Sequence, residues 1–250
     1  MTHNFTLIEN AQDSLEHAIS HLSKTNPLSK GDCKRVILDL SHVVELLFKE
    51  RLRQIHPAFI LSNVDKYPSK TAYTVGTAEA FQRLIKIGGI DFKDEDKSAL
   101  KTIREKRNEI EHYEFKISEK ESKITIGSVL AFIFRFSFHE LNLDWFERRT
   151  NDPSWVKLNE FAEFFESQRE MVLDQLADSQ LALQDCPLCH SETFDMEAEV
   201  CILCGYREEV VECKICKGSY LESDVEYPEA GLCEKCEWED GYASAHYEKY

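Results

Sequence analysis

The chain has 250 residues, of which 42% are hydrophobic, and it carries a formal net charge of −16. Residues 186–250 contain 16 acidic and 5 basic side chains, a net charge of −11, which leaves −5 for residues 1–185. An acidic surface repels the nucleic-acid backbone, so this charge argues against a non-specific nucleic-acid-binding protein but is compatible with a nuclease that has a small basic site.

Helical periodicity dominates residues 1–153, which we predict to form one helical domain. Helices are expected over residues 5–23, 31–55, 77–87 and about 94–115, and over residues 124–146 as one helix or a helix pair. Prolines make 56–74 a loop, and 116–124 is expected to be a charged connector. Residues 154–184 are predicted to form one long amphipathic helix that leads to a C-terminal module over residues 185–250.

The helix expected over residues 94–115 contains an unusual arginine. Leu100, Ile103 and Ile110 mark its apolar stripe, and that stripe, continued at its own spacing, passes through Arg107. A guanidinium group on an apolar seam is costly unless it has a partner, a wet cleft or a ligand. The sequence therefore marks Arg107 as a candidate functional residue.

Arg107 is followed at once by Asn108 and, five residues on, by His112. An arginine can hold a phosphate group and a histidine can move a proton, and RNA cleavage without a metal needs both. The alternative is a solvated charged helix in which Arg107 pairs with Glu111 or Glu114.

The same arginine-to-histidine spacing recurs at Arg51 and His56, so at most one copy is expected to be a functional site. We favour the copy at Arg107, because a polar residue follows its arginine and several amphipathic helices surround it. Basic residues also concentrate near Arg107, at Lys101, Arg104, Lys106 and Lys116.

Arg107 and Asn108 followed by His112, late in a small helical domain, resemble the active-site motif of HEPN (higher eukaryotes and prokaryotes nucleotide-binding) domains. Residues 43–52 also resemble the second helix of these domains, and the resemblance covers about the first 145 residues. It implies an HEPN-like helical bundle. Many members of that family are metal-independent RNases that work as dimers, whereas others only bind their partners.

The resemblance implies roles for the three motif residues. His112 would act as the general base on the RNA 2′-hydroxyl or as the acid on the leaving oxygen, and Arg107 would neutralise the phosphate. Asn108 would position the histidine or the phosphate. The products would carry a 2′,3′-cyclic phosphate and a 5′-hydroxyl, DNA would not be cut, and the setting would be a toxin or an antiviral defence system.

The motif also predicts a homodimer. Five residues turn about 140° around a helix, so Arg107 and His112 do not converge within one ideal helix. The family solves this with two motif helices that meet in one cleft, and a two-fold homodimer with Arg107 at its interface is therefore expected. In the family an acidic residue on the second helix can assist the site, but we expect Glu45 to be a solvated residue at the edge of that helix.

The C-terminal module contains four C-x-x-C pairs, which in a reducing compartment indicate metal binding rather than disulfides. Two such pairs close one tetrahedral four-sulfur zinc site. We expect sequential pairing and two structural Zn²⁺ ions; the alternative is cross-braced pairing. The predicted ligands are Cys186, Cys189, Cys201 and Cys204 for one ion and Cys213, Cys216, Cys233 and Cys236 for the other. Cys33 and His190 are not expected to be ligands.

The module is predicted to be a small zinc-stabilised β-ribbon structure, because about 65 residues cannot bury a large core without metal. Its acidity and its aromatic residues suit protein contacts better than phosphate contacts. Four aromatic residues are expected to be exposed there, namely Tyr206, Tyr220, Tyr227 and Trp238. The module would then either cap or dimerise the helical domain, or bind a separate partner protein.

Two other classes of function compete with the RNase. The first is a non-catalytic dimeric adaptor whose zinc ribbons bind a partner, and the second is a defence component that is silent until triggered. A zinc-dependent enzyme is least expected, since every zinc position is filled. The sequence has no run of eighteen apolar residues and no signal peptide, so we expect a cytoplasmic protein without membrane contact.

Overall fold

The computed structural model describes residues 4–24, 28–69, 71–145 and 152–239. The chain divides into two compact units, residues 1–145 with 157–168 and residues 146–156 with 169–250. The first unit is helical, and the second contains small antiparallel sheets and two groups of four cysteines. A mainly helical chain that ends in a small β module is thereby confirmed.

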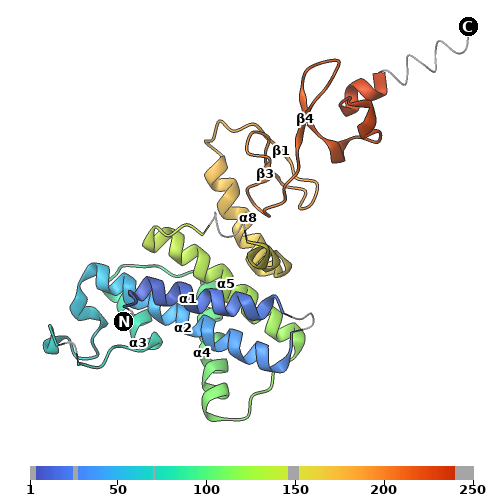
Figure 1. The fold of residues 1–250 in the computed structure, drawn as a ribbon. Helices are drawn as coiled ribbons and strands as arrows, with labels where there is room; N and C mark the ends of the chain where they lie inside the picture. The colour runs from blue at the N-terminus through green and yellow to red at the C-terminus, as the bar shows by residue number, and fades with distance from the viewer. Residues whose placement is uncertain (1–3, 25–27, 70, 146–151, 240–250) are drawn as a thin grey trace, which may run out of the picture. The chain divides into compact units, whose positions relative to one another are not determined.

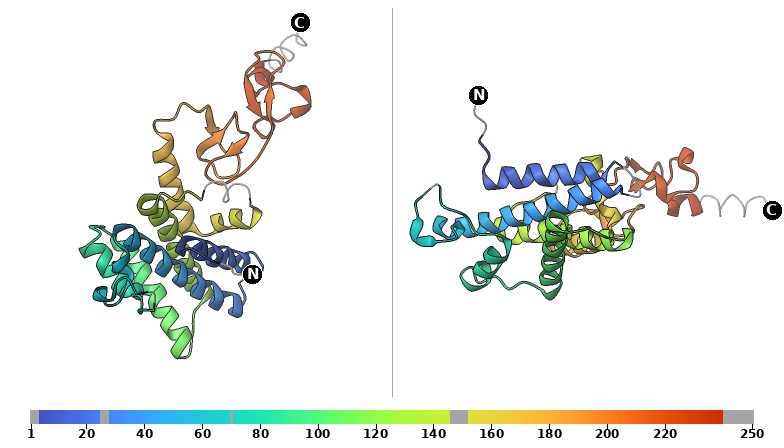
Figure 2. Two further views of the ribbon diagram at one scale, coloured as in Figure 1. Left: turned by 60° about the vertical axis from the view of Figure 1, so that its left-hand side comes forward. Right: turned by 90° about the horizontal axis from the view of Figure 1, so that it is seen from below.

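Five α-helices within the described part of residues 4–145 form most of the first unit (Figure 1). They are α1 (Leu7–Leu22), α2 (Lys30–Ile55), α3 (Thr77–Lys86), α4 (Asp94–His112) and α5 (Glu119–Leu141). The predicted loop after α2 contains two short 3₁₀ helices, η1 (Pro57–Ile60) and η2 (Val64–Lys66). Helices α1 and α2 lie side by side as a hairpin, as both views in Figure 2 show.

The ends of the first two helices follow from local hydrogen bonds. Thr6 accepts from the backbone N–H of Glu9, whose carboxylate accepts from the N–H of Thr6, and this reciprocal capping box starts α1. Ser29 starts α2 by accepting from the N–H of Asp32. These side chains satisfy backbone groups that the helix itself leaves unpaired.

An aromatic cluster forms the centre of the helical unit. The ring of Phe48, on α2, is fully buried and lies within 5.2–6.2 Å, centroid to centroid, of four other rings. Those rings belong to Phe81, Phe92, Phe132 and Phe136. The cluster therefore joins α2, α3 and α5 into one core.

We expect Phe48→Ala to lower the free energy of unfolding of the helical unit by about 3–5 kcal/mol, because it leaves a cavity that the surrounding rings cannot fill. Phe5→Ala is the matched control, since the Phe5 side chain is 63% exposed and its loss should change stability by less than about 0.5 kcal/mol. Urea unfolding followed by far-UV circular dichroism measures both. Equal effects of the two substitutions would contradict this role of Phe48.

Helix α5 has the length and composition of a membrane-spanning helix, but 67% of its apolar stretch is buried inside the protein. This is the pattern of a core helix. Its bounds differ from the predicted 124–146. It begins earlier because Ser118 accepts from the N–H of Glu121 and Glu119 also suits the first turn, so the predicted connector supplies the N-terminal turn. It ends at Leu141, since Asn142 adopts a left-handed conformation with φ 54°.

The prediction of one long helix over residues 154–184 is wrong. The chain forms α7 (Pro153–Val156), η3 (Lys157–Glu160) and α8 (Ala162–Leu176) before the first strand. Phe161 and Glu163 lie so close to Gly127 of α5 that a Cβ atom there would be 3.3 Å from the Phe161 Cβ and 2.7 Å from a Glu163 carboxylate oxygen. This packing on α5 favours a bend at Phe161, and periodicity does not reveal it.

The second unit contains two small sheets. Strands β1 (Leu183–Asp185), β2 (Glu192–Asp195) and β3 (Val200–Cys201) form an antiparallel three-stranded sheet, and β4 (Val210–Glu212) pairs with β5 (Ser219–Leu221). The prediction that Tyr220 is exposed is wrong. Tyr220 is 5% exposed and packs with Cys213 and Cys236 in a core that is otherwise very small. Tyr227 and Trp238 are exposed, and Tyr206 is half-buried.

Candidate active site and metal centres

Arg107 lies on α4 where the apolar stripe reaches the surface, and its side chain is 35% exposed. Its Nη1 donates to Glu45 Oε2 at 3.3 Å, and its Nε donates to Glu111 Oε1 at 3.2 Å. Among the described residues, no hydrogen bond to Nη2 is present. The guanidinium therefore pairs with Glu111 on its own helix, as expected for a solvated charged helix. It also pairs with Glu45 on α2.

Glu45 is not the solvated edge residue that we expected. Its side chain is only 19% exposed, and its carboxylate accepts from Lys49 Nζ at 2.7 Å, Thr77 Oγ1 at 3.2 Å and Arg107 Nη1 at 3.3 Å. Burial alone would raise the pKa of Glu45, but the hydrogen bond and charge of Lys49, the charge of Arg107 and the hydrogen bond from Thr77 together lower it. Glu45 thus stays ionised and fixes the guanidinium. The sequence contained a signal for this role, because Glu45 lies beside the apolar stripe of its helix and four positions before Lys49, with which it can pair.

The lowered pKa of Glu45 predicts a pH-dependent contribution to stability. A carboxyl group whose pKa is lower in the folded state stabilises the fold above its ordinary pKa of 4.5 and loses this effect as the pH falls through the folded value. We expect Glu45→Gln to lower the free energy of unfolding by about 1–3 kcal/mol at pH 7. The difference from wild type should shrink below about pH 4.5. Urea unfolding across this pH range measures it, and a difference that does not change with pH would contradict the assignment.

His112 is the last residue of α4, and Asn108 lies one turn before it. Both side chains are exposed, and within the described parts of the chain neither takes part in a hydrogen bond. Figure 1 shows that the end of α4 projects at the lower edge of the helical unit. Within one chain, the structure therefore leaves His112 and Asn108 at the surface and does not bring them into a cleft with Arg107.

In the second copy of the spacing, both Arg51 and His56 make hydrogen bonds that hold the fold together. Arg51 Nε donates to Glu140 Oε2 of α5 at 3.1 Å, and its side chain is 25% exposed. His56 Nδ1 accepts from the backbone N–H of Ala58 at 3.1 Å and so caps η1. This copy joins elements of the fold, which leaves the copy at Arg107 as the candidate site.

A cavity of about 340 Å³ lies next to the Glu45 network. Thr77, which donates to Glu45, lines it, and so does Arg104, one turn before Arg107 on α4. The remaining lining combines aromatic, polar and basic side chains: Phe48, Phe81, Ala78, Gln82, Leu100, Lys97 and Lys101.

The cysteines form two groups of four, and within each group the ligand atoms lie within 4.8 Å of one another. The grouping is sequential: Cys186, Cys189, Cys201 and Cys204 form one group, and Cys213, Cys216, Cys233 and Cys236 form the other. His190 is exposed and outside both groups, and Cys33 is a buried thiol in α2.

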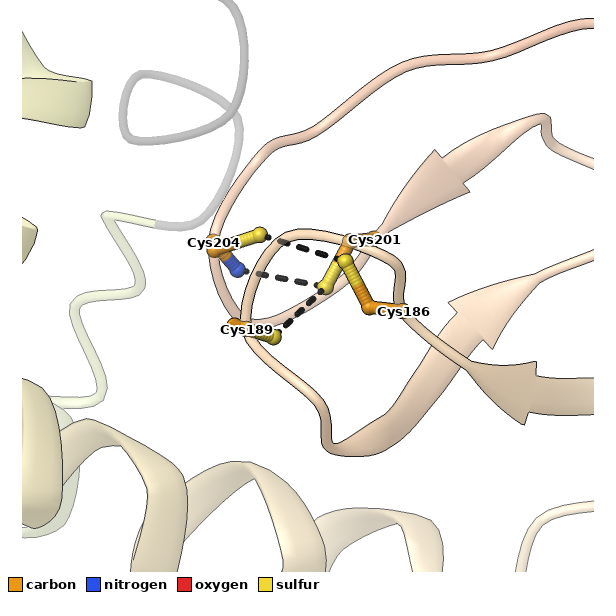
Figure 3. A group of neighbouring side chains, drawn as sticks. All are labelled: Cys186, Cys189, Cys201 and Cys204. Atoms are coloured by element: carbon orange, nitrogen blue, oxygen red, sulfur yellow. Dashed lines mark hydrogen bonds between the residues drawn. The ribbon is translucent and has the colours of Figure 1, made fainter. Parts of the chain in front are cut away.

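The distances between sulfur atoms fit zinc. Cys186 and Cys204 lie 3.6 Å apart, and Cys189 and Cys201 lie 3.7 Å apart, Sγ to Sγ (Figure 3). In the second group, Cys216 and Cys233 lie 3.7 Å apart, Sγ to Sγ. Disulfide sulfurs are about 2.05 Å apart. A zinc ion with Zn–S bonds of about 2.3 Å places its sulfur ligands about 3.8 Å apart. Both groups are therefore compatible with a structural zinc ion.

Hydrogen bonds in the first group stabilise the thiolate of Cys201. Cys201 Sγ accepts from the Cys204 backbone N–H at 3.3 Å and lies 3.2 Å from the Thr193 hydroxyl. Hydrogen bonds from Cys189 and Cys204 lower the pKa of Cys201, whereas burial raises the pKa of Cys186. A metal ion requires the deprotonated form.

The turn after a C-x-x-C pair repeats in both groups. The residue that follows the second cysteine has a positive φ in three of the pairs: 54° at His190, 77° at Gly205 and 62° at Lys217. Its N–H donates to the carbonyl of the first cysteine of its own pair at 2.8–3.0 Å. This left-handed turn favours glycine, yet only Gly205 supplies one, so the geometry of the knuckle overrides the local preference at the other two.

Comparisons with protein-family models, with curated proteins and with solved structures give no match for this chain.

Proposed function

We propose that the protein is a metal-independent endoribonuclease of HEPN type. The observation that carries the proposal is the half-exposed guanidinium of Arg107, which the ionised and largely buried Glu45 holds at the surface end of the α4 stripe. A guanidinium held in this way is oriented before a phosphate arrives, and its Nη2 faces no described hydrogen-bond partner.

The proposed reaction uses the polar end of α4. His112 takes the proton of the RNA 2′-hydroxyl or donates one to the leaving 5′-oxygen, and Arg107 stabilises the charge on the phosphate in the transition state. Asn108 positions either the His112 ring or the phosphate. The 2′-oxygen displaces the 5′-oxygen at phosphorus, so one product ends in a 2′,3′-cyclic phosphate and the other begins with a 5′-hydroxyl.

The ion pair between Arg107 and Glu111 competes with a phosphate for the guanidinium. Glu111 is 37% exposed and lies on the same helix, and such pairs contribute well below 1 kcal/mol. A phosphodiester group of the RNA backbone can therefore displace the Glu111 carboxylate from the guanidinium. Glu45 remains in place, since its other hydrogen bonds to Lys49 and Thr77 do not involve the arginine.

A two-fold homodimer completes the proposed site, because Arg107 and His112 point about 140° apart around one helix. Two motif helices that meet would let the arginine of one subunit face the histidine of the other. Tyr113 and Ile124, which follow the motif and are 78% and 44% exposed, would supply apolar contact area there.

Two structural zinc ions belong to this proposal, one in each cysteine group. All four positions of each ion would be filled by sulfur, so zinc would hold the ribbons together and take no part in the reaction.

The test is the incubation of the zinc-loaded protein, freed of loose metal by gel filtration, with total RNA and separately with DNA. We expect cleavage of RNA alone, by a protein that sediments as a dimer. No cleavage by a folded, zinc-loaded dimer would contradict the proposal.

A dimeric adaptor is the second candidate, and one observation favours it. The third residue of two C-x-x-C knuckles is a large apolar side chain that is 60% exposed in both cases, Leu188 in the first group and Ile215 in the second. Two equivalent apolar tips on an acidic module suit contact with a partner protein. Under this proposal, replacing both tips by serine would abolish partner binding without affecting zinc content.

A further inference from the structure

A row of histidines and aspartates connects α1 and α2 at a place remote in sequence from the Arg107 motif. His17 Nδ1 lies 2.8 Å from Asp39 Oδ2, and His21 Nδ1 lies 2.7 Å from Asp32 Oδ1. The two histidines are four residues apart on α1 and therefore lie on one face of the helix. Their Nε2 atoms are 3.3 Å apart.

The two aspartates determine which ring nitrogen carries the proton. An ionised carboxylate only accepts hydrogen bonds, so each Nδ1 must be the donor, and each Nε2 of a neutral ring then bears a lone pair. Ser29 also donates to Asp32, and this hydrogen bond is the main cause that lowers the pKa of Asp32. Lys24 Nζ lies 3.2 Å from His21 Nδ1 and, because an ammonium group only donates, it competes with Asp32 for that nitrogen; the shorter contact of 2.7 Å belongs to Asp32.

Two lone pairs that face each other at 3.3 Å repel, unless one ring carries a second proton and donates it to the other, or a metal ion lies between them. The ring planes stand perpendicular in a T-shaped arrangement with centroids 4.6 Å apart, so the rings do not stack. A tetrahedral metal ion with bonds of about 2.0–2.1 Å to imidazole holds two nitrogen ligands about 3.4 Å apart. The observed separation matches this value, and a carboxylate on the second nitrogen of each ring is the usual support of a metal-bound histidine.

We propose that His17 and His21 bind a divalent transition-metal ion through their Nε2 atoms, with Asp39 and Asp32 as positioning residues. Imidazole ligands suit Zn²⁺, Ni²⁺ or Cu²⁺. Among the described residues, only the cysteines gather three or more metal-binding side chains, so this site has two protein ligands and the other positions belong to water.

The surroundings of the pair allow both access and charge balance. The His17 side chain is 56% exposed, which gives an ion a path, whereas His21 is 6% exposed and held rigidly. Asp32 and Asp39 supply two negative charges against the ion, and Lys24 and Arg35 are the cations nearest to Asp32, with Arg35 Nη1 3.6 Å from Asp32 Oδ1. The metal would connect two turns of α1 and, through the aspartates, stabilise the α1–α2 hairpin.

The experiment counts metal in the tag-free, full-length protein. Zinc-loaded protein is dialysed against a series of Zn²⁺ concentrations, and bound zinc per chain is measured by mass spectrometry of the element. We expect saturation at three ions for wild type, at two for His17→Gln and at three for the control His139→Gln, whose histidine is also exposed on a helix. Asp39→Asn should weaken the third site about 10- to 100-fold.

A second readout does not depend on counting. In ¹⁵N spectra of the imidazole rings, the third equivalent of zinc should shift the Nε2 signals of His17 and His21 while their Nδ1 atoms stay protonated. Wild type that saturates at two ions, or His17→Gln that still binds three, would overturn the proposal. Circular dichroism of each variant verifies that the helices are intact.

Discussion

Cys204→Ser is expected to reduce the zinc held by the two cysteine groups from two ions to one per chain and to unfold the first ribbon, residues 183–206. Cys204 is 2% exposed, and its sulfur and backbone N–H both contact other members of its group. A structural zinc ion contributes an apparent binding free energy of about 10–16 kcal/mol at pH 7, far more than the small sheets can supply. The ribbon depends on the metal because it lacks a core of adequate size.

Elemental analysis and amide hydrogen exchange measure this effect. Exchange protection should vanish over residues 183–206 and persist in the helical unit. Cys33→Ser is the matched control, since Cys33 is also a buried thiol but lies in α2 outside both groups, and it should leave two zinc ions in place. A Cys204→Ser protein whose first cysteine group still holds zinc and whose first ribbon is still protected would contradict the assignment.

Arg107→Ala and His112→Ala are each expected to lower the rate of RNA cleavage by about 10²- to 10⁴-fold, because each removes one of the two groups that the proposed reaction requires. Neither substitution should unfold the protein. The Arg107 side chain is 35% exposed and His112 lies at the surface, so their contributions to stability are small.

The chain offers its own matched controls in the second copy of the spacing. Arg51→Ala removes an arginine that also pairs with a glutamate, and His56→Ala removes a histidine that caps a short helix. Both should cost stability and leave the cleavage rate of the folded protein within about threefold of wild type. Comparable losses of activity at Arg51 and Arg107 would mean that the activity is not specific to the Arg107 motif, and unchanged activity in both variants would mean that it belongs to a contaminating nuclease.

The spacing of cysteines and of apolar residues in the sequence predicted the features that depend on neighbouring residues. The C-x-x-C pairs define their own turns, so the eight cysteines and their sequential grouping followed from the sequence. Helices α1 to α4 followed from apolar periodicity for the same reason. The start of α5 was missed because Glu119 and Glu121, which suit a first helical turn, also fit the pattern of a solvated connector.

The remaining features depend on contacts between distant parts of the chain. The bend before α8 accompanies its close approach to Gly127, and Glu45 is fixed by Thr77 of α3 and by Arg107, which lies 62 residues further along. The row of His17 and His21 against Asp32 and Asp39 exists only once α1 and α2 pair. A single sequence contains these residues but not their juxtaposition.

The most direct test uses one RNA oligonucleotide that wild type cleaves at a mapped position, with a 2′-deoxynucleotide placed at that position. We expect the ordinary RNA to give a 2′,3′-cyclic phosphate and a 5′-hydroxyl by mass spectrometry, without free metal, and the deoxy-substituted RNA to stay intact. Cleavage of the substituted RNA, or products with a 5′-phosphate, would contradict the reaction assigned to Arg107 and His112.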